Sequence, residues 1–173
     1  AAELAALIGS QSALSNRNII INGAMQVAQR GTSETSVTSS QYANAPDRFK
    51  VAITTGGTWT VSQSTTSPEG FSNSYKFDCT AANGSLSSDS NIQLLQRIEG
   101  QNLQQLAKGT SGAKSVTVSF YVRTNKTGTY TLELFDRDNT RTFSKTYTVS
   151  SADTWEFKSV TFAGDTSGAL DND

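Results

Sequence analysis

The fold is decided by the stretch Ser115-Val116-Thr117-Val118-Ser119-Phe120-Tyr121-Val122-Arg123. Its apolar side chains recur at every second position, which is the period of a β-strand with one buried face. The same alternation is found at residues 49–54, 58–64, 75–79, 92–98, 130–134, 143–149 and 155–162. Short turns separate these stretches, and Gly56-Gly57 is typical of a β-hairpin. Eight strands without a long helix among them predict an all-β protein, a jelly-roll β-sandwich over residues 42–173.

The composition limits the partners of this β protein. Of the 173 residues, 24 are Ser and 23 are Thr, whereas 17% are charged and 35% are hydrophobic. Hydroxyl side chains at this density suit the outer faces of strands. The net charge of -1 provides no basic field for nucleic-acid binding. No apolar run reaches the roughly 20 residues of a membrane span, so neither nucleic acid nor a membrane is an expected partner.

The chain has no His and a single Cys, Cys79. Ser-His-Asp and Cys-His mechanisms and the usual zinc sites need His, and one cysteine forms no intrachain disulfide. Glycoside hydrolysis needs two carboxyl groups at a set distance, which a sequence does not specify. We therefore predict a domain that binds or supports rather than catalyses, with no cofactor. Cys79 shares the phase of Tyr75 and Phe77, which predicts that it is buried.

A short helix is predicted over residues 2–14, within an N-terminal arm formed by residues 1–15. Its apolar stripe consists of Leu4, Leu7, Ile8 and Leu14. A helix of this length needs a partner surface. That surface is either the β domain or the same stripe on other copies of the chain, and the second alternative makes the stripe an oligomerisation site.

Residues 16–41 join the arm to the predicted sandwich. The run Ile19-Ile20-Ile21 predicts a strand covered on both faces, and Gly23 then turns the chain. Residues 32–41 contain almost no apolar side chains and predict a Ser/Thr-rich surface loop.

The alternation also predicts an outward face with candidate ligand contacts. If the Val and Phe side chains of residues 116–122 point into the core, Tyr121 and Arg123 point outward. The outward phase of neighbouring strands adds Phe135, Arg97, Glu133 and Gln93. Aromatic rings stack on the apolar face of a sugar, while planar polar groups hold its hydroxyls. Glycan contact, packing by the Ile-rich segment or a neighbouring subunit, and plain solvent exposure remain open as alternatives.

Two further features each have a structural and a functional interpretation, and a third has a structural one. Trp59 follows the Gly-Gly turn and is either a core residue or a stacking platform for the same glycan. The hairpin residues Asp136, Asp138 and Asn139 are a weak alternative for a calcium site, although Asp and Asn are common in hairpin turns. Near Lys158 the apolar phase slips by one residue, which predicts a β-bulge and an inward Phe157 beside a buried Trp155.

Two motifs resemble a module of tailed-bacteriophage structural proteins. The first is Arg17-Asn18-Ile19-Ile20-Ile21-Asn22-Gly23-Ala24-Met25-Gln26-Val27-Ala28-Gln29-Arg30-Gly31, followed by Asp47-Arg48-Phe49. The second is Gln96-Arg97-Ile98-Glu99-Gly100 together with residues 115–123. Many proteins with this module are described as tail-fibre or receptor-binding proteins. The later half is also similar to the galactose-binding-like jelly-roll modules that bind carbohydrate in polysaccharide-degrading enzymes.

The resemblance implies a virion protein of the tail-fibre or appendage type, assembled in the bacterial host cytoplasm with other virion proteins. It implies a homo-oligomer, with a trimer favoured, and a sandwich that binds the host surface, where a glycan is one candidate ligand. Because the family usually continues past this point, we expect a sandwich truncated at its C-terminus. Two alternatives stay open: a carbohydrate-binding module of a secreted polysaccharide-degrading enzyme, and a capsid decoration or head-fibre protein without a ligand.

Overall fold

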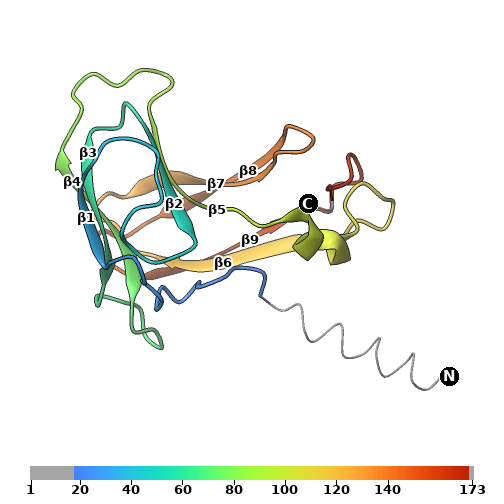
Figure 1. Ribbon diagram of the computed structural model, residues 1–173, viewed down its shortest axis with the longest axis horizontal. Coiled ribbons are helices and arrows are strands. Elements are labelled where there is room, and N and C mark those ends of the chain that lie inside the picture. The colour runs from blue at the N-terminus through green and yellow to red at the C-terminus, as the bar shows by residue number, and fades with distance from the viewer. Residues whose placement is uncertain (1–17, 172–173) are drawn as a thin grey trace. The chain divides into compact units, whose positions relative to one another are not determined.

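A computed structural model describes residues 18–171 of the chain (Figure 1). The chain divides into two compact units, of which the first ends at Arg97 and the second begins at Ile98. This division falls within the region predicted as one sandwich, residues 42–173, and each unit is described by itself. The proposed oligomerisation stripe, Leu4, Leu7, Ile8 and Leu14, lies outside the described residues.

The first unit contains two antiparallel sheets. Its strands are β1 (Ser33–Val37), β2 (Phe49–Thr54), β3 (Thr58–Ser64), β4 (Ser74–Ala81) and β5 (Asn91–Gln96). One sheet has the order β1-β3-β4, and the other pairs β2 with β5. The hairpin β3–β4 is therefore enclosed in sequence by the pair β2–β5.

The second unit repeats this nested order of pairing. It contains a 3-10 helix, η1 (Gly100–Leu106), and the strands β6 (Val116–Val122), β7 (Gly128–Asp136), β8 (Arg141–Val149) and β9 (Glu156–Phe162). The antiparallel pair β6–β9 encloses the hairpin β7–β8. The all-β class is confirmed, and the eight predicted strands correspond to β2–β9. Among the described residues, no helix is long and apolar enough to cross a membrane.

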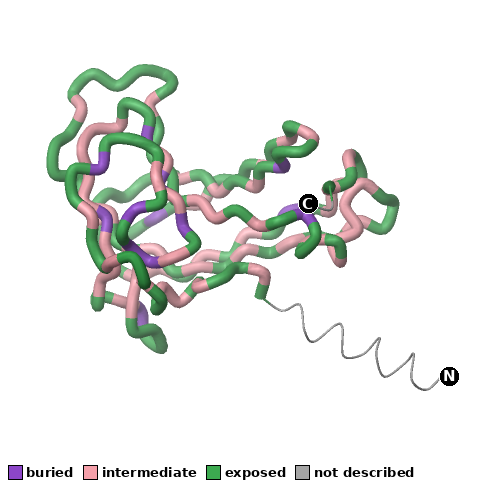
Figure 2. Tube along the Cα trace, in the orientation of Figure 1, coloured by how far each residue is buried: buried purple, intermediate pink, exposed green. Residues whose placement is uncertain are grey.

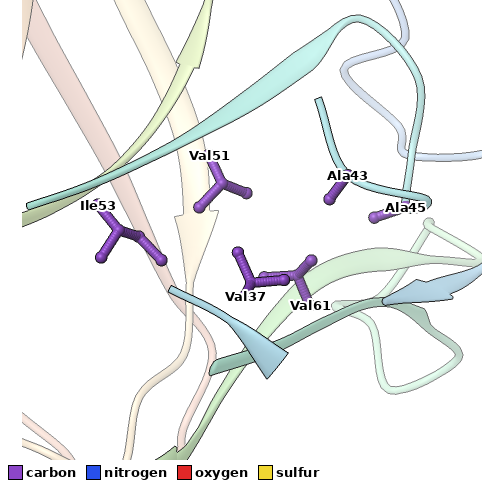
Figure 3. Close-up of a cluster of buried hydrophobic side chains, with 6 residues drawn as sticks. All are labelled: Val37, Ala43, Ala45, Val51, Ile53 and Val61. Atoms are coloured by element: carbon purple, nitrogen blue, oxygen red, sulfur yellow. The ribbon is translucent and has the colours of Figure 1, made fainter. Parts of the chain in front are cut away.

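The core of the first unit lies between its two sheets (Figure 3). Its buried side chains are Val37, Ala43, Ala45, Val51, Ile53 and Val61. Trp59 packs against this cluster and donates a hydrogen bond from its Nε1 to the carbonyl of Gly56 (2.8 Å). The Trp59 ring is thus partly buried against the core and bonded to the turn that precedes it.

Two predictions for residues 16–41 are wrong. Residues 32–41 are not only a loop, because β1 pairs with β3 and buries Val37 with 1% of its surface exposed. The run Ile19-Ile20-Ile21 is not a covered strand, since Ile20 and Ile21 are 37% and 46% exposed. The main chain of Ile21 bonds instead to the side-chain amide of Gln96, with both distances 2.8 Å.

Cys79 is exposed, which corrects the prediction that it is buried. It shares the phase of Tyr75 and Phe77 on β4, and both of these rings pack against the core. Burial along β4 stops after Phe77, and every later residue of the strand is exposed (Figure 2). Alternation defines the side of a strand but not how far along it the covering core extends.

In the second unit, the apolar faces of the two strand pairs meet. Phe120 of β6 contacts Tyr147 of β8 edge-to-face, with ring centroids 5.0 Å apart. Tyr147 also stacks on Tyr130 of β7 at 5.7 Å. Because these rings lie on the inner faces, the outer face of β6–β9 and the outer face of β7–β8 are different surfaces.

The predicted β-bulge in the last strand is absent from the β6–β9 register. The pairing runs without a shift from Val116 opposite Phe162 to Val122 opposite Glu156. The inner positions of β9 include Glu156 and Lys158, whose side chains pair at 2.6 Å and are largely covered. Phe157 consequently points outward. The apolar phase slips because an internal ion pair occupies two inward positions, with the backbone of β9 remaining regular.

Candidate functional site

The outer face of β6–β9 carries an exposed pair of aromatic rings. Tyr121 and Phe157 are opposite each other in the strand register. Their ring centroids lie 5.3 Å apart with the planes inclined at 59°. Tyr121 is 43% exposed and Phe157 is 58% exposed. Exposed aromatic pairs are unusual on a surface that is otherwise polar, and they provide contact area for a ligand.

Hydroxyl groups continue this face along the strands. The Thr117 and Thr161 hydroxyls are 2.8 Å apart, and those of Ser119 and Ser159 are 3.0 Å apart. We define the outer platform as the six side chains of Thr117, Ser119, Tyr121, Phe157, Ser159 and Thr161. None of the six is charged at neutral pH. The platform therefore combines two rings with two hydrogen-bonded hydroxyl pairs and carries no charge of its own.

Arg123 lies just beyond the ring end of the platform. Its Nε donates to the carbonyl of Asp153 (2.8 Å), and its guanidinium is 3.6 Å from the Asp153 carboxylate. Asp153 has a left-handed backbone, with φ of 56°. Arg123 thus fixes the turn between β8 and β9 and contributes an ion pair at the edge of the platform.

The structure distributes the residues predicted for one ligand face over several surfaces. It brings Tyr121 and Arg123 together at one end of β6. Glu133 and Phe135 lie on the outer face of β7–β8, opposite Ser144 and Thr142. Gln93 and Arg97 belong to the first unit, at and beyond β5. Trp59 packs on the core of that unit.

Phe157 is the member of the platform that the sequence analysis assigned to the wrong side. The apolar pattern of residues 155–162 placed it inward, but the pair Glu156 and Lys158 takes the inward positions. A signal was present in the sequence, because Glu156 and Lys158 are oppositely charged and two residues apart. Such a pair can neutralise itself on the inner face, which leaves the intervening Phe157 outside.

A buried ion cluster lies at the loop end of the second unit. The ammonium of Lys108 contacts the carboxylates of Asp136 and, at 3.1 Å, Asp165. Arg141 donates two hydrogen bonds to Asp165 at 2.9 and 3.0 Å. The side chains of Lys108, Asp136 and Asp165 are 12%, 5% and 10% exposed. The cluster joins three segments: the loop after η1, the β7–β8 hairpin and the chain after β9.

The partners of these groups determine their charge. Burial is the largest single influence and disfavours both ionised forms in the Lys108–Asp136 pair. Their mutual hydrogen bond and attraction, together with the contacts of Lys108 with Asp165 and of Asp136 with Asn139, outweigh burial, so the pKa of Lys108 is raised and the pKa of Asp136 is lowered. Hydrogen bonds from Arg141 lower the pKa of Asp165 to about 2. All four groups are therefore charged at neutral pH. General-acid catalysis requires a carboxyl group with a raised pKa, and these two carboxyl groups have the opposite shift.

The same contacts bear on the calcium alternative. The Asp136 carboxylate accepts the Asn139 amide at 2.9 Å besides the Lys108 ammonium. Asp138 accepts the backbone N–H of Asp171 at 3.0 Å. An ammonium group thus takes the position that a cation would take at Asp136. Within residues 18–171, no group of three or more His, Cys, Asp or Glu residues is arranged to hold a metal.

Residues of the first sequence motif, Asn22 to Arg30 together with Asp47, form a hydrogen-bonded clasp. The Asn22 amide donates to the carbonyls of Val27 (2.9 Å) and Asp47 (3.1 Å), while its Oδ1 accepts the N–H of Val27 (3.0 Å). The Asp47 carboxylate accepts the N–H of Gln29 at 2.9 Å and lies 3.5 Å from Arg30. The motif residues Asn22 and Asp47 therefore hold the backbone of a loop.

The comparisons with known proteins add no relative. No protein-family model matches the chain, and no curated protein or solved structure does so at a significant level.

Proposed function

We propose that the chain is a non-catalytic binding module of a bacteriophage virion appendage of the tail-fibre type. In this proposal the module presents the outer platform of β6–β9 to the surface of the host cell. The observation that carries the binding role is the exposed pair of Tyr121 and Phe157, since solvent-facing rings of this kind mark sites of interaction. The appendage role rests on the motif around Asn22 and Asp47.

The proposed arrangement of the strands is a jelly roll of the galactose-binding type. Support comes from the antiparallel pairing of all eight strands from β2 to β9. A jelly roll has eight strands in two Greek keys, and β2–β9 supply that number within the described residues. We further propose that residues 1–15 attach the module to other virion proteins and assemble it as a trimer.

Antibody labelling of the parent particle tests the appendage role. A purified chain should raise antibodies that label tail fibres or a comparable appendage in electron micrographs. Labelling of the capsid surface would favour the decoration protein instead. A particle without label, together with a secreted enzyme that contains the chain, would favour the carbohydrate-binding module and overturn the proposal.

Competition for adsorption tests the binding role. The purified chain, added in excess, should slow adsorption of the parent phage to its host. A variant with Tyr121→Ala and Phe157→Ala should compete at least tenfold less well at equal concentration. Phe135→Ala is the matched control, because it removes an exposed ring from the outer face of β7–β8. Equal competition by the double variant and the wild type would contradict the role of the platform.

A further inference from the structure

We infer that the outer platform binds an uncharged, soluble glycan chain, with one pyranose ring seated against Tyr121 and Phe157. This inference deepens the proposed function and rests on it for the biological setting. The chemical reasons for it come from the platform alone.

The ring pair provides the apolar half of a sugar site. The C–H bonds on one face of a pyranose pack well against an aromatic ring, as do other apolar surfaces. Two rings with centroids 5.3 Å apart cover an area comparable with one sugar residue. A larger apolar partner would find only these two side chains, because the other four members of the platform carry hydroxyls.

The hydroxyl pairs provide the polar half. Each pair, Thr117 with Thr161 and Ser119 with Ser159, uses one O–H donor and one acceptor for its internal bond. A pair of hydroxyls has two donors, so one O–H per pair is left for a ligand, along with acceptor lone pairs. Sugar hydroxyls also donate and accept. From Tyr121 to Thr117 the strand extends about 14 Å, which suits a short run of sugar residues.

Charge selects among glycans. The six side chains of the platform are neutral. Of the cations beside it, Arg123 is engaged with Asp153, and the Lys145 ammonium donates to the backbone carbonyl of Thr161 at 2.7 Å. An acidic polysaccharide binds best where guanidinium groups pair with its carboxylates, and no such group lies within the platform. The platform therefore favours neutral sugars over uronic or sialic acids.

The inclination of the rings selects the physical form of the glycan. Planes at 59° form an angled seat, whereas the face of a crystalline polysaccharide is flat. A single chain can place one residue in the seat and its neighbours along the hydroxyls. We therefore expect binding to soluble chains and not to crystalline ones.

A protein partner fits this face less well. Stable protein interfaces bury about 800 Å² per partner around an apolar centre, and the platform offers two apolar side chains in a row of hydroxyls. Self-association through the rings is nevertheless a measurable alternative. Sedimentation of the wild type and the double variant distinguishes it, because a ring-mediated dimer would dissociate when both rings are removed.

The test is affinity electrophoresis and titration calorimetry with defined polysaccharides. The probes are soluble neutral glucans, galactans and mannans, the acidic polymers alginate and polygalacturonate, and crystalline cellulose and chitin. We expect binding to at least one soluble neutral polymer. Tyr121→Ala or Phe157→Ala should weaken it about tenfold, and both together should abolish it. Tyr121→Phe keeps the ring and should retain most of the affinity.

Controls separate loss of binding from loss of folding. Phe135→Ala removes an exposed ring elsewhere in the same unit and should leave the affinity within twofold. Each variant must melt within a few degrees of the wild type, and Tyr121→Phe provides a readout if Tyr121→Ala does not fold.

Several outcomes would overturn the inference. They are a lack of binding to every soluble neutral polymer, a preference for acidic or crystalline polymers, undiminished binding by the double variant, and a dimer that depends on the rings. None of these outcomes bears on where antibodies label the particle, so this inference and the proposed appendage role fail separately.

Discussion

The two units of this chain consist of similar strands but are stabilised differently. In the first unit, small aliphatic side chains from both sheets form a dry core, and the ion pair of Arg30 with Asp47 lies at the surface. In the second unit, Val149 and Phe162 are buried, most other inner side chains are half-buried, and the ions of Lys108, Asp136 and Asp165 are covered as well.

The difference shows that strands with few buried apolar side chains can still have their loops held in place by buried ions. A dry core stabilises every element that contributes to it in proportion to the buried apolar area. A buried ion cluster stabilises only the segments that supply its members, but it fixes their geometry tightly. The chain has two tryptophans, Trp59 in the first unit and Trp155 in the second. Trp59→Phe and Trp155→Phe backgrounds therefore allow the fluorescence of each unit to be followed separately.

The largest effect is expected from Lys108→Met. It leaves the carboxylates of Asp136 and Asp165 covered without their shared cation, and loss of one partner from a buried ion pair costs about 3–5 kcal/mol. Denaturant unfolding followed through Trp155 should show this loss of stability. Lys76→Met is the control, since Lys76 pairs with Asp78 at the surface and should cost less than about 1 kcal/mol. Equal effects of the two substitutions would show that the cluster has no special role.

Ile53→Ala should come next and act on the first unit. Ile53 is 5% exposed within the core cluster, and truncation of a buried isoleucine to alanine costs about 2–5 kcal/mol. The loss should be seen through Trp59 and should leave the signal of Trp155 unchanged in midpoint. Ile21→Ala truncates an exposed isoleucine and should change stability by less than about 0.5 kcal/mol. A shared shift of both tryptophan signals would show that the units unfold together.

Asn22→Ala should have a smaller effect, about 1–3 kcal/mol, because it deletes three hydrogen bonds of the clasp. It also places alanine at a φ of 57°, which favours Asn or Gly. Asn22→Gly separates the two contributions, since glycine adopts this φ freely but lacks the amide. Unfolding through Trp59 measures both. Full stability of Asn22→Gly would mean that the clasp bonds contribute nothing.

The smallest effect near neutrality is that of pH. The lowered pKa values of Asp136 and Asp165 mean that their contribution is complete above their ordinary pKa of 3.8 and is lost as the pH falls through the lowered values, about 2 for Asp165. The raised pKa of Lys108 means that its contribution is complete below its ordinary pKa of 10.5 and is lost as the pH rises through the raised value. Melting of the second unit should therefore be nearly constant between about pH 4 and 10.

Lys108→Met provides the check on this pH profile. Without the ammonium group, the loss of stability below pH 4 should become shallower, because the ionised form of Asp136 loses the partner Lys108 and keeps only its hydrogen bonds from the main chain and Asn139. The stability of the first unit should fall above pH 10. Burial raises the pKa of Tyr75 in the folded chain to about 12, whereas the ordinary value is 10.0. Between these two values the unfolded chain loses the Tyr75 proton and the folded chain keeps it, which favours unfolding. An acid profile unchanged by the substitution would contradict the assignment to the cluster.

The sequence was sufficient to predict the strands because side-chain period 2 is a local property. Val116, Val118 and Phe120 face inward as predicted, and their neighbours face outward. It was insufficient wherever a polar side chain replaces an apolar one. In β1 the single apolar side chain is Val37, so the strand shows no apolar alternation. Beside Ile21 the side chain of Gln96, and not a neighbouring strand, bonds to the main chain, so a run of three isoleucines is not a covered strand.

The candidate site was only partly predictable for a related reason. Tyr121 follows from the clean alternation of β6, whereas Phe157 does not follow from β9, because the pair Glu156 and Lys158 is internal. The separation of Glu133 and Phe135 from Tyr121 depends on which inner faces meet, as the contact of Phe120 with Tyr147 shows. Contacts of this kind between distant strands leave no local trace in the sequence.

The position of the ion cluster has a mechanical consequence. In β6–β9 the start of one strand is opposite the end of the other, Val116 against Phe162. Tension applied to the two ends of this unit would load that edge first and peel the hydrogen bonds apart one after another. Lys108 precedes β6 and Asp165 follows β9, so their bond at 3.1 Å, together with the hydrogen bond from the N–H of Gly109 to the carbonyl of Asp165 at 2.9 Å, bears the pull before the strands do. The cluster thus resists the stepwise separation of β6 and β9 under tension.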